Sequence, residues 1–158
     1  MDVITMPSTI SLIKRLKADY PEFSFEKSSS FSWSHVDKII YYSVGVEKHN
    51  DSLLLHELSH GLLDHHDYKR DIELIAMESA AWDKAKKLSQ KYNVEVNEEF
   101  IQDNLDTYRD WLHRRSTCPD CTATGLQVKK DSYDCLSCGY SWKVNEARTC
   151  ALRRYGTN

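Results

Sequence analysis

The sequence predicts an α+β protein with a small cysteine-rich ribbon near its C-terminal end. Four stretches repeat apolar residues at helical spacing, short alternating stretches near the N-terminus predict strands, and two Cys-x-x-Cys pairs lie near the C-terminus. The chain has 158 residues, 41% of them hydrophobic and 28% charged, which suits one soluble domain with an appendage. We therefore expect a main domain over residues 1–115, a ribbon over 116–145 and a polar tail over 146–158.

The N-terminal third predicts one helix followed by a small sheet. Pro7 stands at the expected helix start and Pro21 just beyond its end, and the apolar residues between them share one face. Three later segments either alternate in polarity or are rich in β-branched and aromatic residues, as strands are. They predict a small antiparallel sheet of about three strands, namely Phe23–Phe25, Phe31–Trp33 and Lys38–Val44.

The next segment, Asp51–His66, is predicted to be a helix that contains the sequence His-Glu-Leu-Ser-His at positions 56–60. Its leucines recur at three- and four-residue steps, which is the apolar stripe of an amphipathic helix. Asn50 and Asp51 are residues that commonly cap a helix N-terminus, so we expect the helix to begin there.

On such a helix, His56 and His60 lie one turn apart on the same face. Two imidazoles at that spacing can bind one zinc ion, and we predict both histidines as metal ligands. Glu57 lies beside them on the same turn, where it can reach a water molecule at the metal. We predict Glu57 as the general base of a catalytic zinc site.

A catalytic zinc ion held by two histidines needs a third protein ligand. The next predicted helix, near Asp71–Lys91, carries Glu78 inside its buried apolar stripe, where an unpaired carboxylate is costly. We therefore predict Glu78 as the third ligand, with Glu73 and Asp64 as alternatives. Glu73 lies on a more polar side of its helix, and Asp64, one turn beyond His60, is better placed to orient a histidine.

A fourth helix is predicted between Asn97 and Arg115. It has an acidic first turn, a basic last turn that suits the negative end of the helix dipole, and apolar residues repeating between them. It carries no signal for a site, and we expect it to contribute to core packing.

Two pairs of cysteines follow this helix. The spacing of the two Cys-x-x-Cys units predicts a structural zinc ion held by four thiolates, those of Cys118, Cys121, Cys135 and Cys138. Short strands are expected around Val128–Tyr133 and Tyr140–Lys143, and Cys150 is left over. The predicted cofactors are therefore two zinc ions, one catalytic and one structural.

Net charge and hydropathy limit the classes of partner that the chain can bind. The net charge of −3 gives the whole chain no general attraction to nucleic acid. The C-terminal end, ribbon and tail together, nevertheless has a basic lean and two aromatic residues that could stack on bases, the residues being Lys129, Lys130, Lys143, Arg148, Arg153, Arg154, Tyr140 and Trp142. No apolar run reaches the length of a membrane span, and the N-terminus lacks the core of a signal peptide. We expect a cytoplasmic protein without a membrane partner, with nucleic acid as a candidate partner of the ribbon.

The motif helix and the sequence Met-Glu-Ser-Ala-Ala-Trp at 77–82 resemble zincin metallopeptidases of the ImmA/IrrE group over roughly residues 39–88. The resemblance implies a zincin-like core, His56 and His60 as ligands, Glu57 as general base and Glu78 as the third ligand. Members of that group cleave repressor-type regulators. A zincin followed by a cysteine ribbon is also similar in layout to SprT-like proteases, which act on proteins near DNA. That family takes its third ligand from a later histidine motif, which this chain lacks.

The function predicted from these residues is zinc-dependent hydrolysis of a peptide bond in a protein or peptide substrate. We expect the strand Ile39–Val44 to flank the cleft and to receive substrate as an added strand. His65, His66 and Tyr68 are candidates for stabilising the oxyanion, on sequence proximity alone. The alternative is a module without catalytic activity, whose ribbon binds nucleic acid or protein.

Overall fold

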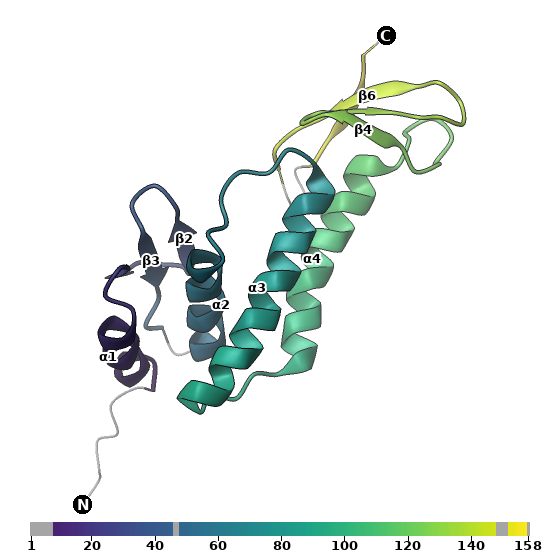
Figure 1. Cartoon of the computed structure of the whole chain (residues 1–158). Coiled ribbons are helices and arrows are strands. Elements are labelled where there is room, and N and C mark those ends of the chain that lie inside the picture. The colour runs from purple at the N-terminus through teal and green to yellow at the C-terminus, as the bar shows by residue number, and fades with distance from the viewer. Residues whose placement is uncertain (1–7, 46–47, 148–151, 158) are drawn as a thin grey trace, which may run out of the picture. The chain divides into compact units, whose positions relative to one another are not determined.

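The computed structural model describes residues 8–45, 48–147 and 152–157 (Figure 1). The predictions made for Pro7, Arg148 and Cys150 lie outside these residues. The described helices are α1 (Ser8–Asp19), α2 (Asn50–Leu62), α3 (Asp71–Tyr92) and α4 (Glu98–Ser116), and the described strands are β1 (Ser24–Lys27), β2 (Ser32–Ser34), β3 (Ile39–Tyr42), β4 (Leu126–Lys129), β5 (Ser132–Asp134), β6 (Ser141–Val144) and β7 (Arg154–Gly156). The predicted α+β class is confirmed.

The chain divides into two compact units. The first comprises Met1–His66 and Met77–Glu98, and the second comprises Asp67–Ala76 and Glu99–Asn158. Helix α3 contributes its first residues, up to Ala76, to the second unit and the remainder to the first. Helix α4, which we expected in the main domain, groups with the ribbon strands in the second unit.

The sheet of the first unit is mixed, whereas we predicted an antiparallel one. Its strand order is β1-β3-β2, with β3 antiparallel to β2 and parallel to β1. β2 and β3 form a hairpin, and β1 pairs in parallel with the other edge of β3. Because β3 is hydrogen-bonded to a strand on both sides, it cannot receive a substrate strand, and the prediction that Ile39–Val44 does so is wrong.

The core of the first unit lies between this sheet, α1, α2 and the part of α3 that belongs to the unit. Leu54, Leu55 and Leu58 of α2 are fully buried. The other elements contribute further buried apolar residues to this core, among them Leu12, Leu16, Phe25, Ile40, Trp82 and Ala85. Gly61 allows α2 to approach closely Phe23, which directly precedes β1, and Trp33 of β2. A Cβ atom at position 61 would lie 3.1 Å from the ring of Trp33 and 3.3 Å from that of Phe23.

Helix α2 is held at its N-terminus by contacts to other segments. Its N-cap position is His49, which makes no side-chain capping hydrogen bond. The Asn50 amide donates to the carbonyl oxygen of Gly45, and Asp51 accepts a hydrogen bond of 2.7 Å from the Thr9 hydroxyl of α1. The prediction that Asn50 or Asp51 caps the helix is therefore wrong, since both side chains are used for tertiary contacts.

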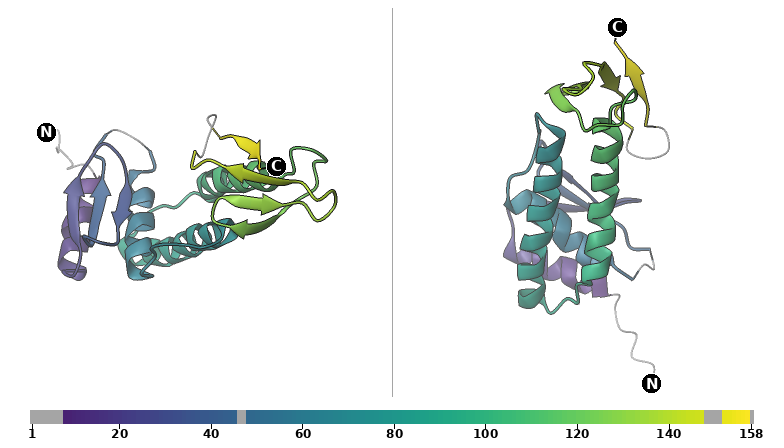
Figure 2. Two further views of the ribbon diagram at one scale, coloured as in Figure 1. Left: turned by 90° about the horizontal axis from the view of Figure 1, so that it is seen from above. Right: turned by 90° about the vertical axis from the view of Figure 1, so that its right-hand side faces the viewer.

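The second unit contains a four-stranded antiparallel sheet in the order β4-β5-β6-β7 (Figure 2). The first three strands confirm the predicted ribbon strands. The fourth lies in the segment that we expected to be only a polar tail, and in it Tyr155 pairs with Lys143 and Arg154 with Val144. The Arg154 guanidinium also donates to the carbonyl oxygen of Thr117 at the end of α4. Part of the polar tail is therefore an edge strand of the ribbon.

A buried ion pair joins the ends of two helices to the ribbon within the second unit. Arg115 and Asp71 are 1% and 0% exposed, and the Arg115 Nε atom lies 2.7 Å from Asp71 Oδ2. The Tyr133 hydroxyl of β5 donates to the same carboxylate. Arg115 also donates to the carbonyl oxygens of Lys130 and Asn145. Arg115 was expected only to complement the helix dipole at the end of α4, but it is a buried anchor of this unit.

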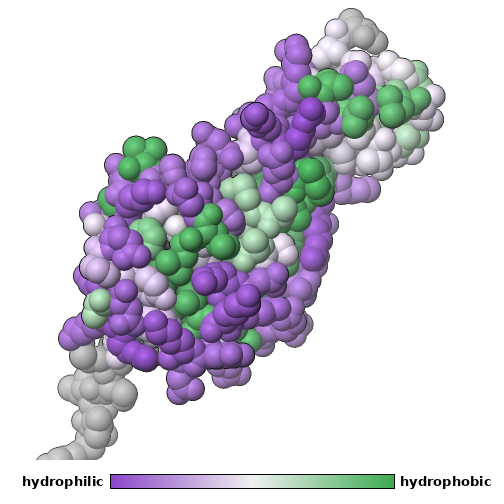
Figure 3. Space-filling view, viewed as in Figure 1, coloured by the Kyte–Doolittle hydropathy of each residue, from purple (hydrophilic) through white to green (hydrophobic). Residues whose placement is uncertain are grey.

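The described helices include none with both the length and the apolar character that crossing a bilayer requires. Figure 3 shows a mainly hydrophilic surface that is interrupted by hydrophobic side chains. In the second unit, exposed Ile72, Leu126 and Val128 line a groove of about 610 Å³.

Candidate metal centres

Helices α2 and α3 bring two histidines and a glutamate together in the first unit. His56 Nε2 lies 2.9 Å from Glu78 Oε2, and His60 Nε2 lies 3.3 Å from Glu78 Oε1. The two Nε2 atoms lie 3.1 Å apart. All three side chains are buried. The atoms that converge here are four potential electron-pair donors of the kinds that zinc prefers.

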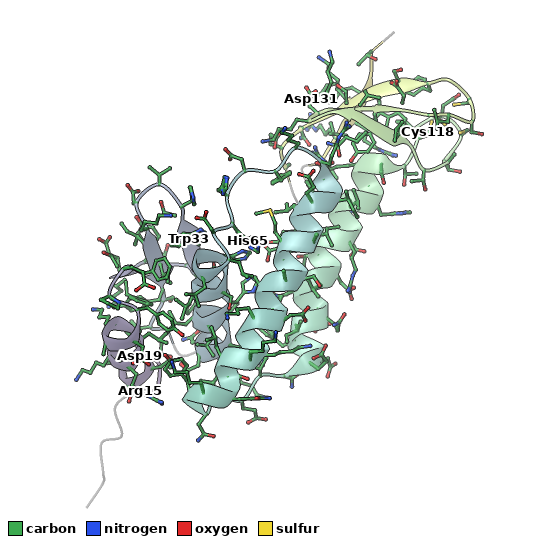
Figure 4. The ribbon with its side chains drawn as sticks, viewed as in Figure 1. Arg15, Asp19, Trp33, His65, Cys118 and Asp131 are labelled. Atoms are coloured by element: carbon green, nitrogen blue, oxygen red, sulfur yellow. The ribbon has the colours of Figure 1, made fainter. Side chains whose placement is uncertain are left out.

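The surroundings of this histidine–glutamate cluster orient each imidazole. The indole of Trp82, one turn after Glu78 on α3, stacks on the ring of His56 with centroids 4.2 Å apart. His60 Nδ1 lies 2.9 Å from His65 Nδ1, so one of these two nitrogens donates a hydrogen bond to the other. The carbonyl oxygen of His65 accepts a hydrogen bond of 2.9 Å from the indole nitrogen of Trp33 on β2 (Figure 4). These contacts direct both Nε2 atoms towards Glu78.

The ionisation of the cluster follows from burial and from its own charges. Burial lowers the pKa of His56, although the hydrogen bond and charge of Glu78 act in the opposite direction. Burial also disfavours the charged form of His60, but the hydrogen bond and charge of Glu78 outweigh it and raise the pKa of His60. Burial alone would raise the pKa of Glu78, yet hydrogen bonds from both imidazoles hold it well below its usual range. Glu78 is therefore an ionised acceptor facing two ring nitrogens.

Glu57 lies on the same turn of α2 as the histidines and is partly buried. Burial raises the pKa of its carboxyl to about 7, while the nearby His60 acts to lower it. A carboxyl group with a pKa near neutrality can both accept and release a proton at physiological pH. This position beside the cluster is the one that the sequence predicted for a general base.

The two alternative carboxylates lie elsewhere. Glu73 accepts hydrogen bonds from the backbone N–H groups of Lys69 and Arg70, which cap the start of α3. Asp64 is exposed and lies 3.1 Å from His35 Nε2 and 3.4 Å from Lys38 Nζ. The expectation that Asp64 orients a histidine of the motif is therefore wrong, because α2 ends at Leu62 and the chain turns before Asp64. Of the three carboxylates considered, Glu78 is the one that meets both His56 and His60.

The four predicted cysteines also converge, in the second unit. The Sγ atoms of Cys118 and Cys138 lie 3.7 Å apart, and those of Cys121 and Cys135 lie 3.5 Å apart. Each Cys-x-x-Cys unit is a turn, with a hydrogen bond from the N–H of Thr122 to the carbonyl of Cys118 and one from Gly139 to Cys135. The backbone N–H of Cys138 points at the Cys135 sulfur and lowers the pKa of that thiol to about 7. The geometry of this cysteine cluster could hold a metal ion.

Ligand spacing tests whether zinc fits the two clusters. Tetrahedral zinc with nitrogen and oxygen ligands at about 2.0–2.1 Å keeps those ligands roughly 3.3 Å apart, and with sulfur at about 2.3 Å roughly 3.8 Å apart. The separations of 2.9–3.3 Å in the histidine–glutamate cluster and 3.5–3.7 Å in the cysteine cluster are close to these values. The sulfur separations also exceed the disulfide bond length of about 2.05 Å. The donor sets of both clusters therefore fit zinc.

Packing removes one residue from the predicted nucleic-acid surface. Trp142 is 0% exposed, stacks on Tyr133 and donates a hydrogen bond of 2.8 Å to the carbonyl oxygen of Arg115. It cannot stack on a base, so that prediction is wrong for Trp142. Conversely, the sequence did not single out Trp82 as a contact of His56 or His65 as a contact of His60. A helical repeat of four residues from Glu78 to Trp82 is the signal that could have indicated the first of these contacts.

Comparisons of the chain with family models, with curated proteins and with solved structures found no match.

Proposed function

We propose that the protein is a zinc metallopeptidase that hydrolyses peptide bonds in a protein substrate. The observation that carries this proposal is the buried meeting of His56, His60 and Glu78 from two helices, with Glu57 beside it on the same turn. Two imidazoles and one carboxylate are the ligands of many catalytic zinc sites, which keep one coordination position open. The resemblance to the ImmA/IrrE group supports the same assignment and suggests a regulator of the repressor type as substrate.

Each residue has a distinct role in this proposal. Zinc held by the three ligands would supply Lewis acidity towards the substrate carbonyl and would make water more acidic. Glu57 takes the proton from the attacking water and returns it to the leaving amine. His65 positions the His60 ring through its 2.9 Å contact, and Trp82 fixes the plane of the His56 ring by stacking.

We assign the cysteine cluster to a structural zinc ion. Four thiolates would fill a tetrahedral shell and leave no position for substrate. The cluster adjoins a small core of Tyr133, Trp142 and Val144, too small to keep the ribbon folded by itself. Thiolate ligation also requires reduced cysteines, which agrees with the cytoplasmic location that we propose.

The decisive experiment compares Glu57→Gln with Glu26→Gln, an exposed glutamate on β1. Zinc content, cleavage of labelled unfolded casein and binding of a zinc-chelating peptide hydroxamate are measured for both variants and the wild type. We expect Glu57→Gln to keep both zinc ions and hydroxamate binding but to lose about 10²–10⁴-fold in cleavage rate, as expected for loss of a general base. Glu26→Gln should behave as wild type. Zinc at the cluster with neither hydroxamate binding nor cleavage would contradict the proposal.

The runner-up is a module whose second unit binds protein or nucleic acid, either alone or beside a protease of SprT-like layout. The groove lined by Ile72, Leu126 and Val128 suits an apolar peptide segment. Lys129, Lys130 and Lys143 are exposed and could contact phosphates, whereas Trp142 is buried and could not stack on a base. Binding to DNA that weakens with salt and is unchanged in Glu57→Gln, together with no proteolysis, would favour this function.

A further inference from the structure

We propose that His35, Asp64 and His66 form a third, solvent-exposed site for a divalent transition metal, with zinc as the cation. These three residues belong to the first unit but not to the histidine–glutamate cluster, and their potential ligand atoms lie within 4.8 Å of one another. His35 directly follows β2, whereas Asp64 and His66 follow α2. The site therefore joins two segments that are far apart in the sequence, since His35 and Asp64 are 29 positions apart.

The spacing of His35 and Asp64 and the tautomer of His66 suit ligation. His35 Nε2 lies 3.1 Å from Asp64 Oδ1, which is close to the spacing of roughly 3.3 Å between two ligands of one zinc ion. His66 Nδ1 lies 2.9 Å from the carbonyl oxygen of Asp64, so Nδ1 carries the proton and Nε2 keeps its lone pair. A hydrogen bond from Nδ1 to a carbonyl is a common way for proteins to prepare Nε2 for a metal.

Contacts within and around the proposed site hold the two segments together. The rings of His35 and His66 stack with centroids 4.4 Å apart, and His35 also contacts the edge of Trp33. The Trp33 indole donates to the carbonyl of His65, between Asp64 and His66. Asp64 has a φ of 55°, which turns the chain after α2, and its N–H donates to the carbonyl oxygen of Gly61. Closing the site around a cation therefore requires side-chain movement alone, including rotation of the two imidazole rings out of their stack.

One positive charge competes for the proposed site. Lys38 Nζ lies 3.4 Å from Asp64 Oδ1, the oxygen that would ligate the metal. Both side chains are largely exposed, at 47% and 67%, so this ion pair is weak. The Lys38 ammonium also lies 5.8 Å from the centre of the Trp33 ring. Its charge can keep this cation–π interaction when a metal ion displaces it from Asp64. Removing the lysine charge should therefore strengthen metal binding.

A cation at this site would act on the histidine–glutamate cluster through His65. Asp64 and His66 flank His65, whose Nδ1 contacts His60. Ligation of both neighbours would hold that segment in place and keep His65 against His60. This regulatory consequence rests on the proposed zinc peptidase function, whereas metal binding by the three residues does not.

The test is equilibrium dialysis of the full chain against rising concentrations of free zinc, followed by elemental analysis. We expect the wild type to bind about two zinc ions tightly and a third more weakly, as the three donor sets require. His35→Ala/His66→Ala should lose the third ion and keep the other two. His113→Ala removes an exposed histidine of α4 and should keep all three. His56→Ala/His60→Ala should lose one tight ion and keep the weak one.

Lys38→Met should have the opposite effect to removing the ligands. We expect it to raise the affinity for the third zinc ion several-fold. The proposal is overturned if the wild type binds no third ion, if the third ion persists in His35→Ala/His66→Ala, or if Lys38→Met leaves its affinity unchanged. Loss of the third ion from His113→Ala to the same degree would identify non-specific uptake and also overturn it. A third ion without any zinc at His56 and His60 would support this site and refute the peptidase.

Discussion

The cysteine cluster and the histidine–glutamate cluster collect metal-ligand side chains by different means. The cysteine cluster consists of two local pairs, each made within one turn of chain, and its four sulfur atoms fit a closed tetrahedral shell. The histidine–glutamate cluster takes two residues from α2 and a third, Glu78, that lies 22 positions beyond His56. It exists only if α2 and α3 pack side by side.

The difference explains why the two clusters suit different tasks. A closed set of four thiolates can stabilise a ribbon that has little core of its own, because the free energy of metal binding becomes free energy of folding. In the proposed enzyme, three donors on rigid helices would leave one coordination position free, with Glu57 next to it. The first cluster should therefore govern the stability of its unit, and the second should govern chemistry.

The largest expected effect is on the cysteine cluster. Cys135→Ser should abolish metal binding there and unfold the ribbon, because apparent binding free energies of structural zinc are about 10–16 kcal/mol. Ser137→Ala, in the same turn, is the matched control and should leave zinc content and folding unchanged. Zinc content and hydrogen exchange of β4–β6 are the measurements. A Cys135→Ser protein with full protection of these strands would show that the cluster does not stabilise the ribbon.

Removing the buried ion pair tests whether the stability of the helices in the second unit also depends on their contacts with the ribbon. Arg115→Met should destabilise this unit by about 3–5 kcal/mol, since it leaves the charge of Asp71 buried without its partner. Arg114→Met, at the exposed neighbouring position, should change stability by less than about 0.5 kcal/mol. Hydrogen exchange of β5 and β6 at increasing urea concentrations measures the stability of this unit in both variants. Equal effects of the two substitutions would mean that the pair is not an anchor.

Packing at the ribbon gives a smaller effect. In Gly125→Ala the new Cβ would come within 2.9 Å of one atom of the Trp142 ring and 3.2 Å of the Asp134 carbonyl oxygen. We expect a destabilisation of about 1–3 kcal/mol, typical of overpacking. Gly45→Ala is the control, because its nearest neighbour, the Ser43 hydroxyl, would be at an ordinary 3.6 Å. Gly125→Ala should therefore unfold at a lower temperature than Gly45→Ala. An unchanged unfolding temperature of Gly125→Ala would show that Trp142 can move.

The last prediction concerns the histidine–glutamate cluster alone. His65→Ala should weaken zinc binding there by about 10–100-fold, the usual cost of losing a residue that orients a metal ligand. The cysteine cluster should keep its zinc at full occupancy. Competition with a chelator of known affinity measures both sites in one sample. Unchanged affinity at the histidine–glutamate cluster would mean that the contact between His65 and His60 has no role in positioning the ring.

Local patterns in the sequence predicted the helices closely, and the reason is that helix periodicity and breakers act over a few residues. The helix that we expected near Asp71–Lys91 is Asp71–Tyr92. The motif helix begins close to the expected residue, but it ends at Leu62 and not at His66 as expected. The convergence of the four cysteines also follows from short spacings. Glu78 could be chosen because a carboxylate inside an apolar stripe demands a partner. Its role as a ligand remains a prediction.

Features that depend on distant partners were missed or misjudged. The parallel pairing of β1 with β3, the strand at Arg154–Gly156 and the contact of Asp51 with Thr9 of α1 all depend on partners outside the local sequence. Trp142 was expected at the surface and Arg115 at a solvated helix end, yet both are buried. Their residue types fit either environment, so composition alone could not decide between them.

The sequence by itself determined the elements and the chemical groups available: two histidines and a glutamate on one helical turn, a glutamate on an apolar face, and two cysteine pairs. Only the tertiary structure decided which of three carboxylates meets His56 and His60, and which residues hold those rings in place. The physical reason is range. Helix formation and tight turns are set by neighbours in the chain, whereas the position of a buried carboxylate is set by the packing of whole helices against a common core.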